Sequence, residues 1–134
     1  MEVKIENRYL KPSIELLFNL PLRGKESRQR TKFIKRLQKR LEEVENDRIE
    51  LAREYAKIDE KGNPIVKHDR YDIGDVKSFE KELNELYNEK MVIDGGDSEE
   101  MLKTVKEVLL NCNKEFSGSE AIVYDYLCDQ FEKI

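Results

Sequence analysis

The chain of 134 residues is poor in the residue types on which metal sites, disulfide scaffolds and many active sites depend. It has no Trp, one His and two Cys, with only three Pro and six Gly. Two cysteines are too few for a disulfide framework and fit a reducing compartment. Charged residues make up 40% of the chain, which with so little Gly and Pro favours solvated helices over short strands. At this length we expect one domain with one core, residues 1–134.

Membrane and secretion signals are also missing. No apolar run approaches the length of a membrane span, and the opening residues MEVKIENRYL contain neither the basic nor the apolar part of a signal peptide. We therefore expect a cytoplasmic protein that makes no membrane contact.

Little in the sequence supports catalysis. The single histidine, His68, lies in a predicted loop with no cysteine close to it, so neither a zinc site nor a Ser-His-Asp set can be argued. The spacing of Asp94, Asp97 and Glu99 is not the calcium-binding pattern of an EF-hand. Neither KGNP nor DGGD opens a phosphate-binding helix. The sequence predicts a protein that is not an enzyme and holds no metal or cofactor.

The spacing of apolar residues predicts a mainly α fold, a helical bundle of about five helices with one long helix and a minor two-stranded β pairing. The long helix extends from about Ser27 to Ile58, and the turn residues DEKGNP end it. Residues 2–9 alternate as a half-buried strand does, and residues 91–94 read as a short buried strand. Because lone strands leave backbone groups unpaired, we predict that these two pair with each other. Residues 59–74 are predicted to form a protruding loop or small hairpin.

Capping residues predict where three later helices begin. Asp75 is the expected N-cap of the helix that follows the loop. Asp97 with Glu100, and Ser117 with Glu120, match the capping-box pattern at the start of the last two helices.

Positive charge is concentrated in one stretch of this acidic chain. Residues 23–40, RGKESRQRTKFIKRLQKR, contain nine Lys or Arg and a single acid, although the net charge of the chain is −4. At about 100° per residue, five of these cations fall on the side of the long helix opposite its apolar residues. Arg30 falls on the apolar side, where we expect it to extend outward or to meet an acid. We call the five cations the basic stripe: Arg28, Lys32, Lys35, Arg36 and Lys39.

Cations near a helix N-terminus oppose the helix dipole, so something should offset them. One candidate is the acidic remainder of the chain itself, including residues 94–100. A second is an acidic protein partner, which such a stripe would contact and steer. A third is nucleic acid, although residues 23–32 have no aromatic side chain for stacking on bases.

The apolar stripe of the long helix has two interpretations. The spacing fits the a and d positions of a coiled coil with one charged position, so a homodimer through this helix is conceivable. The same spacing is what an ordinary core helix requires, and we favour core packing. The positions are Ile34, Leu37, Leu41, Val44, Arg48, Leu51, Tyr55 and Ile58.

Several segments resemble a family of small uncharacterised proteins, a domain of unknown function, from phages and prophages of Gram-positive bacteria. The resemblance covers nearly the whole chain. Its carriers are VKIENRYL, LPLRGKESRQR, AKIDEKGNP with the YDI that follows, MLKTVKEVLL and FSGSEAIVYDYLCDQFE.

The resemblance implies a phage accessory protein in the cytoplasm of a bacterial host. The expected function is non-enzymatic binding to a host or phage protein, with the basic stripe as the contact and modulation of a host or defence protein as the expected effect. One alternative is a virion-related role as a tail or assembly component. A second alternative is nucleic-acid binding.

Overall fold

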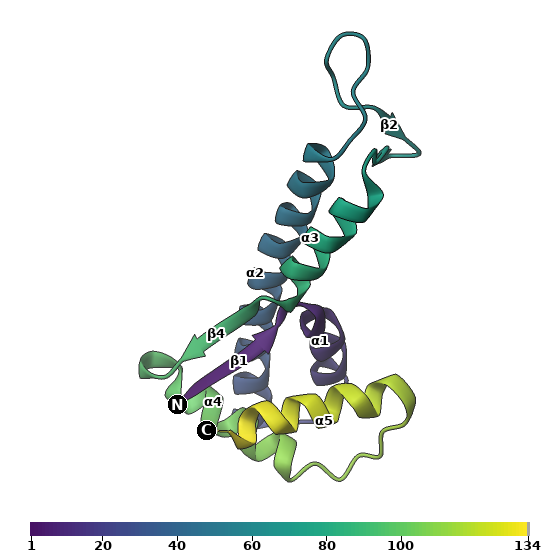
Figure 1. Ribbon diagram of the computed structural model, residues 1–134. Helices are drawn as coiled ribbons and strands as arrows, with labels where there is room; N and C mark the ends of the chain where they lie inside the picture. The colour runs from purple at the N-terminus through teal and green to yellow at the C-terminus, as the bar shows by residue number, and fades with distance from the viewer. Residues whose placement is uncertain (134) are drawn as a thin grey trace.

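The computed structural model describes residues 1–133 and shows a long helix that joins a packed lobe to a projecting arm (Figure 1). Within these residues there are five α-helices, two short 3-10 helices and four strands. In chain order the elements are β1 (Glu2–Glu6), η1 (Asn7–Tyr9), α1 (Leu10–Phe18), α2 (Gly24–Glu54), β2 (Val66–Lys67), β3 (Arg70–Tyr71), α3 (Val76–Asn88), β4 (Lys90–Asp94), η2 (Gly96–Ser98), α4 (Glu99–Leu110) and α5 (Gly118–Glu132). The predicted mainly α fold, with one long helix and a minor strand pairing, is confirmed.

The predicted pairing of the first strand with the distant short strand is also confirmed. β1 and β4 are antiparallel, with Val3 opposite Ile93 and Ile5 opposite Met91. Val3, Ile5 and Ile93 are fully buried, whereas Val92 is 51% exposed. The prediction that residues 91–94 form a buried strand was therefore wrong in part, because only one face of this two-stranded sheet is covered.

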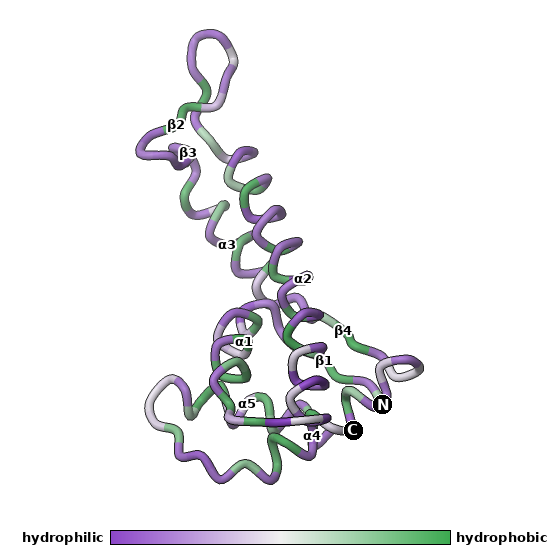
Figure 2. Tube along the Cα trace, turned by 180° about the vertical axis from the view of Figure 1, so that it is seen from behind, coloured by the Kyte–Doolittle hydropathy of each residue, from purple (hydrophilic) through white to green (hydrophobic). Residues whose placement is uncertain are grey.

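One apolar core holds the lobe together. The N-terminal half of α2 packs against α1 and α4, α5 packs against α1 and α4, and β1 with β4 completes the cluster. Phe33 of α2 meets Phe131 of α5 edge to face, with ring centroids 5.6 Å apart. In Figure 2 hydrophilic and hydrophobic residues alternate along the helices of both the lobe and the arm, as they do in amphipathic elements.

The arm consists of the C-terminal half of α2, the antiparallel α3 and the tip that joins them (Figure 1). The long helix ends at Glu54 and not near Ile58 as predicted, because the next residues form extended pairs: Ala56 bridges Ile73, and Ile58 bridges Pro64. β2 and β3 form a hairpin whose two turn residues, His68 and Asp69, have φ of 52° and 63°. Two consecutive positive φ values are what a tight two-residue hairpin turn requires.

The predicted N-terminal caps of the last three helices are present only in part. Asp75 caps α3 as predicted, since its carboxylate accepts a hydrogen bond from the Ser78 backbone N–H at 3.2 Å. Ser117 is the N-cap residue of α5, but neither α4 nor α5 has a side-chain cap, so the predicted capping boxes do not form. At α4, residue 97 belongs to η2 and the helix begins at Glu99.

Candidate functional site

All five residues of the basic stripe are exposed on the N-terminal half of α2. The opposite side of the same turns carries Phe33, Ile34 and Leu37, which are 0%, 6% and 0% exposed. Because the buried side faces α1 and α4, the lobe fixes the direction in which the stripe points. The stripe residues are Arg28, Lys32, Lys35, Arg36 and Lys39.

The acidic segment after β4 lies along one edge of the stripe. Lys25 in the first turns of α2 forms an ion pair with Glu100, and this contact lowers the pKa of the Glu100 carboxyl. Arg36 donates a hydrogen bond from Nη1 to Ser98 Oγ at 2.9 Å. A groove of about 410 Å³ separates the two sides and is lined by Gln29, Lys32, Lys35, Arg36, Asp97, Ser98, Glu100 and Met101. The chain's own acids thus offset part of the positive charge at the start of α2.

The outer part of the stripe has no such partner. Within residues 1–133, no ion pair of 4.0 Å or less joins Arg28, Lys32, Lys35 or Lys39 to a carboxylate. Four cations therefore remain available to a negatively charged ligand along three turns of one helix. Their exposure means that water already solvates them, so any partner must offer several negative charges at matching spacing.

Arg30 does not extend outward or meet an acid, as the sequence predicted. Its guanidinium donates from Nη1 to the carbonyl oxygens of Leu17 and Leu20, at 2.6 and 2.9 Å. These carbonyls lie at and just beyond the C-terminal end of α1, which is the negative end of a helix dipole. Backbone carbonyls replace the expected carboxylate, and Arg30 thereby ties α2 to the end of α1.

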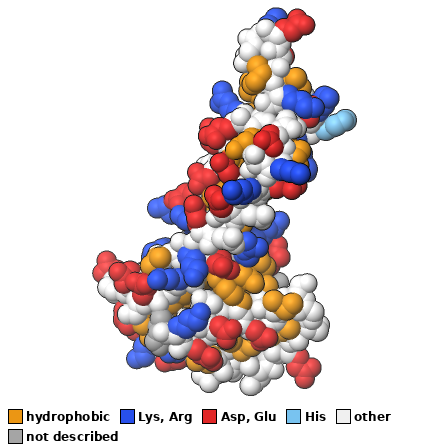
Figure 3. Space-filling model, viewed as in Figure 1, with side chains coloured by type: hydrophobic (Ala, Val, Ile, Leu, Met, Phe, Trp, Pro, Cys, Tyr) orange, Lys and Arg blue, Asp and Glu red, His pale blue; other side chains and the backbone are white. Residues whose placement is uncertain are grey.

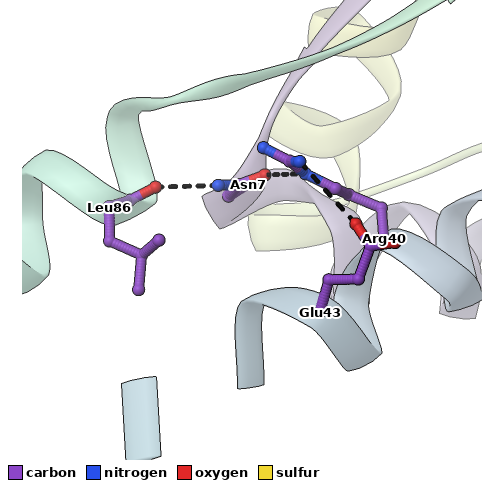
Figure 4. Close-up of polar contacts among 4 residues, drawn as sticks. All are labelled: Asn7, Arg40, Glu43 and Leu86. Atoms are coloured by element: carbon purple, nitrogen blue, oxygen red, sulfur yellow. Dashed lines mark hydrogen bonds and ion pairs between the residues drawn. The ribbon is translucent and has the colours of Figure 1, made fainter. Parts of the chain in front are cut away.

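A polar junction that sequence reasoning missed joins the arm to the lobe (Figure 4). Asn7 is 3% exposed. Its amide donates to the Leu86 carbonyl at 2.8 Å, and its Oδ1 accepts from Arg40 Nε at 3.1 Å. Its backbone N–H donates to the Glu89 carbonyl at 2.8 Å, and Arg40 lies 3.8 Å from Glu43. The only sequence signal was an Asn between the apolar residues of a strand and those of a helix.

Charge changes sign along α2. Beyond the basic stripe, one face of the arm forms a shallow acidic groove of about 350 Å³ between α2 and α3. Its carboxylates come from both helices, and it is lined by Asp47, Glu50, Leu51, Glu54, Glu82, Glu85, Leu86 and Glu89. The lobe end of the long helix is thus basic and its arm end acidic.

The histidine lies on the arm and the two cysteines lie in the lobe. His68 is exposed in the tight turn of the tip. Among residues 1–133, no three His, Cys, Asp or Glu side chains come together in an arrangement that could hold a metal ion. Cys112 and Cys128 are free and half-buried, and burial raises the pKa of the Cys128 thiol, which disfavours the reactive thiolate. In the same described part of the chain, no helix has both the length and the apolar character needed to cross a membrane.

The apolar stripe of α2 divides at the edge of the lobe. Ile34, Leu37 and Val44 are buried in the core, so this half of the stripe is used within the chain. Beyond it, Leu51 is half-buried against α3, and Ile58 lies past the end of the helix in the tip.

A family model described as Protein of unknown function (DUF1617) matches residues 1–134. No curated protein and no solved structure matches the chain.

Proposed function

Since the chain belongs to the DUF1617 family, we propose a function from its surface: it is a phage accessory protein that acts by binding another protein and not by catalysis. Its partner is a host or phage protein with an acidic surface, and the contact is the basic stripe. A host defence protein is one partner of this kind, and the bacterial cytoplasm is where the two would meet.

The observation that carries this proposal is the unpaired charge on a rigid element. Arg28, Lys32, Lys35 and Lys39 stay exposed on a helix whose other side is buried in the core, while Lys25 already has an acidic partner within the chain. Cations held at fixed helical spacing favour an acidic surface of complementary shape and increase the rate of association. The half-buried thiols and the lone exposed histidine offer no comparable arrangement for chemistry.

The test is a tagged pull-down from phage-infected cells, at low and high salt and with and without nuclease, followed by mass spectrometry. We expect one protein to be captured in a nuclease-resistant and salt-sensitive manner. A variant with all five stripe residues changed to Glu should lose that protein while its circular dichroism spectrum stays native.

A matched control separates the stripe from net charge. Five other exposed cations changed to Glu give the same net charge and should leave capture intact: Lys11, Arg53, Lys77, Lys81 and Lys103. If both variants lose the partner equally, binding depends on the net charge of the protein and not on the position of the stripe residues. If nuclease abolishes capture and the salt dependence follows the number of phosphates neutralised, the ligand is nucleic acid.

A virion-related role is the second candidate, and the projecting arm favours it. An arm with half-exposed apolar side chains is suited to docking against other proteins of an assembly. The two roles predict different locations, because an assembly component remains in purified particles and a modulator of host proteins does not. Immunoblotting of purified particles against infected-cell lysate decides between them.

A further inference from the structure

Apolar residues of α2 continue beyond the lobe that covers the first half of the helix. Val44 is the last residue of α2 that is fully buried, at 2% exposed. Five residues later, about 140° around the helix, Ile49 is 45% exposed, although the helix continues to Glu54. Within residues 45–90, Ala56 is the only buried residue. The arm therefore presents apolar side chains that its own two helices do not cover.

These side chains line a groove of about 890 Å³ on the side of the arm away from the acidic groove. α2 supplies Ile49 and Ala52, α3 supplies one side of the groove, and the tip closes its end with Val66, which is 58% exposed. The space-filling view shows hydrophobic side chains on the arm among charged ones (Figure 3). The apolar and aromatic lining of the groove is completed by Tyr71, Ile73, Phe79, Leu83 and Tyr87.

Two helices alone cannot bury the stripes that face each other between them. A helical pair leaves both sides of its interface open, and in a four-helix bundle a second pair covers one of those sides. α3 has no fully buried residue, and its apolar side chains, such as Phe79 and Leu83, remain half-exposed. The arm thus has the composition of half a bundle.

The charges at the rim indicate what completes it. The groove is bordered by two acids and two arginines, Glu45 and Asp69 with Arg48 and Arg70. Arg48 Nη2 lies 3.1 Å from Glu45 Oε2, so this part of the groove's border carries charges of both signs side by side. A two-fold interface places the same patch on both partners and so requires a patch that is complementary to itself. A neutral rim with equal numbers of both signs meets that requirement, whereas the acidic groove on the other face would repel its own copy.

We propose that this groove is a dimerisation surface, in which the arm of a second copy of this chain packs antiparallel to the first and the two arms form a four-helix bundle. The arm projects from the lobe, so antiparallel arms place the two lobes at opposite ends (Figure 1). The contact residues lie on the arm and not on the basic stripe, so this inference does not depend on the proposed function.

The first test is sedimentation equilibrium of the full chain over a range of concentrations. We expect the purified protein to reach twice the monomer mass. Ile49→Glu places a carboxylate in the bundle core and Val66→Glu places one at the end of the same groove, and each should weaken the dimer by at least about tenfold, because a buried unpaired charge is strongly unfavourable. Both positions are open to solvent in the monomer, so the variants should fold.

The control is Ile122→Glu, which changes an isoleucine that is 63% exposed on α5 of the lobe. It should leave the dimer unchanged. A chain that stays monomeric at every concentration would overturn the proposal, as would a dimer that resists both arm variants. If the dimer is lost only on reversal of the basic stripe, the interface lies there and the inference is wrong.

A charge exchange at the rim tests for a second copy directly. A variant with Arg48→Glu and Arg70→Glu has an acidic rim, and one with Glu45→Lys and Asp69→Asn has a basic rim. Each alone should be mostly monomeric, and their equimolar mixture should form heterodimers detectable by native mass spectrometry. Heterodimers that form no better than either homodimer would show that the rims do not meet.

Discussion

Replacement of Asn7 by Ala tests whether the junction in Figure 4 holds the arm to the lobe. The change removes a hydrogen bond to the Leu86 carbonyl and one that Arg40 donates to the Asn7 side chain, in a site where Asn7 is only 3% exposed. A neutral hydrogen bond contributes about 1 kcal/mol, and one to a charged group about 1.5–3 kcal/mol. Because Arg40 is part-exposed and water can replace some of the loss, we expect a destabilisation of about 2–3 kcal/mol.

The assay is urea unfolding followed by circular dichroism, with thermal unfolding in parallel. For a chain of this size, a loss of about 2–3 kcal/mol should lower Tm by roughly 6–12 °C. Asn19→Ala is the matched control: its amide donates to the Glu15 carbonyl at 2.9 Å on the surface, so the change should cost less than about 0.5 kcal/mol. Equal effects of the two substitutions would refute the argument that burial makes Asn7 important.

Two further predictions concern helix ends. Arg30→Ala should destabilise the protein by about 2–4 kcal/mol in the same assay, because it leaves the Leu17 and Leu20 carbonyls without their charged donor, whereas Arg30→Lys should recover only part of the loss. The Asp75 carboxyl has a pKa lowered mainly by its hydrogen bond with the Ser78 side chain, so its contribution is complete above the usual Asp pKa of about 4 and is lost as pH falls through the lower folded value. Wild type should therefore be more stable than Asp75→Ala at pH 7 and lose this advantage in acid, and a difference that is independent of pH would contradict the role of the charge.

The sequence by itself determined the parts of the fold that depend on local periodicity. Alternation at Val3 and Ile5 identified a half-buried strand, and the spacing of apolar residues identified the long helix. The requirement that backbone groups be paired was enough to join β1 to β4 across the chain. The basic stripe was also visible, since about 100° per residue fixes which side chains share a face.

Only the tertiary structure decided how these elements use their polar groups. Arg30 binds the end of α1 and Asn7 binds α3 and α2, because the chain brings together groups that lie 10–79 residues apart. Helical periodicity is the same along all of α2, so the sequence could not show that the lobe buries the apolar stripe as far as Val44 and leaves Leu51 only half-buried on the arm. How far along a helix its apolar stripe is buried depends on where the helices and strands packed against it end. Packing between elements sets that limit, and the spacing of residues within one helix does not.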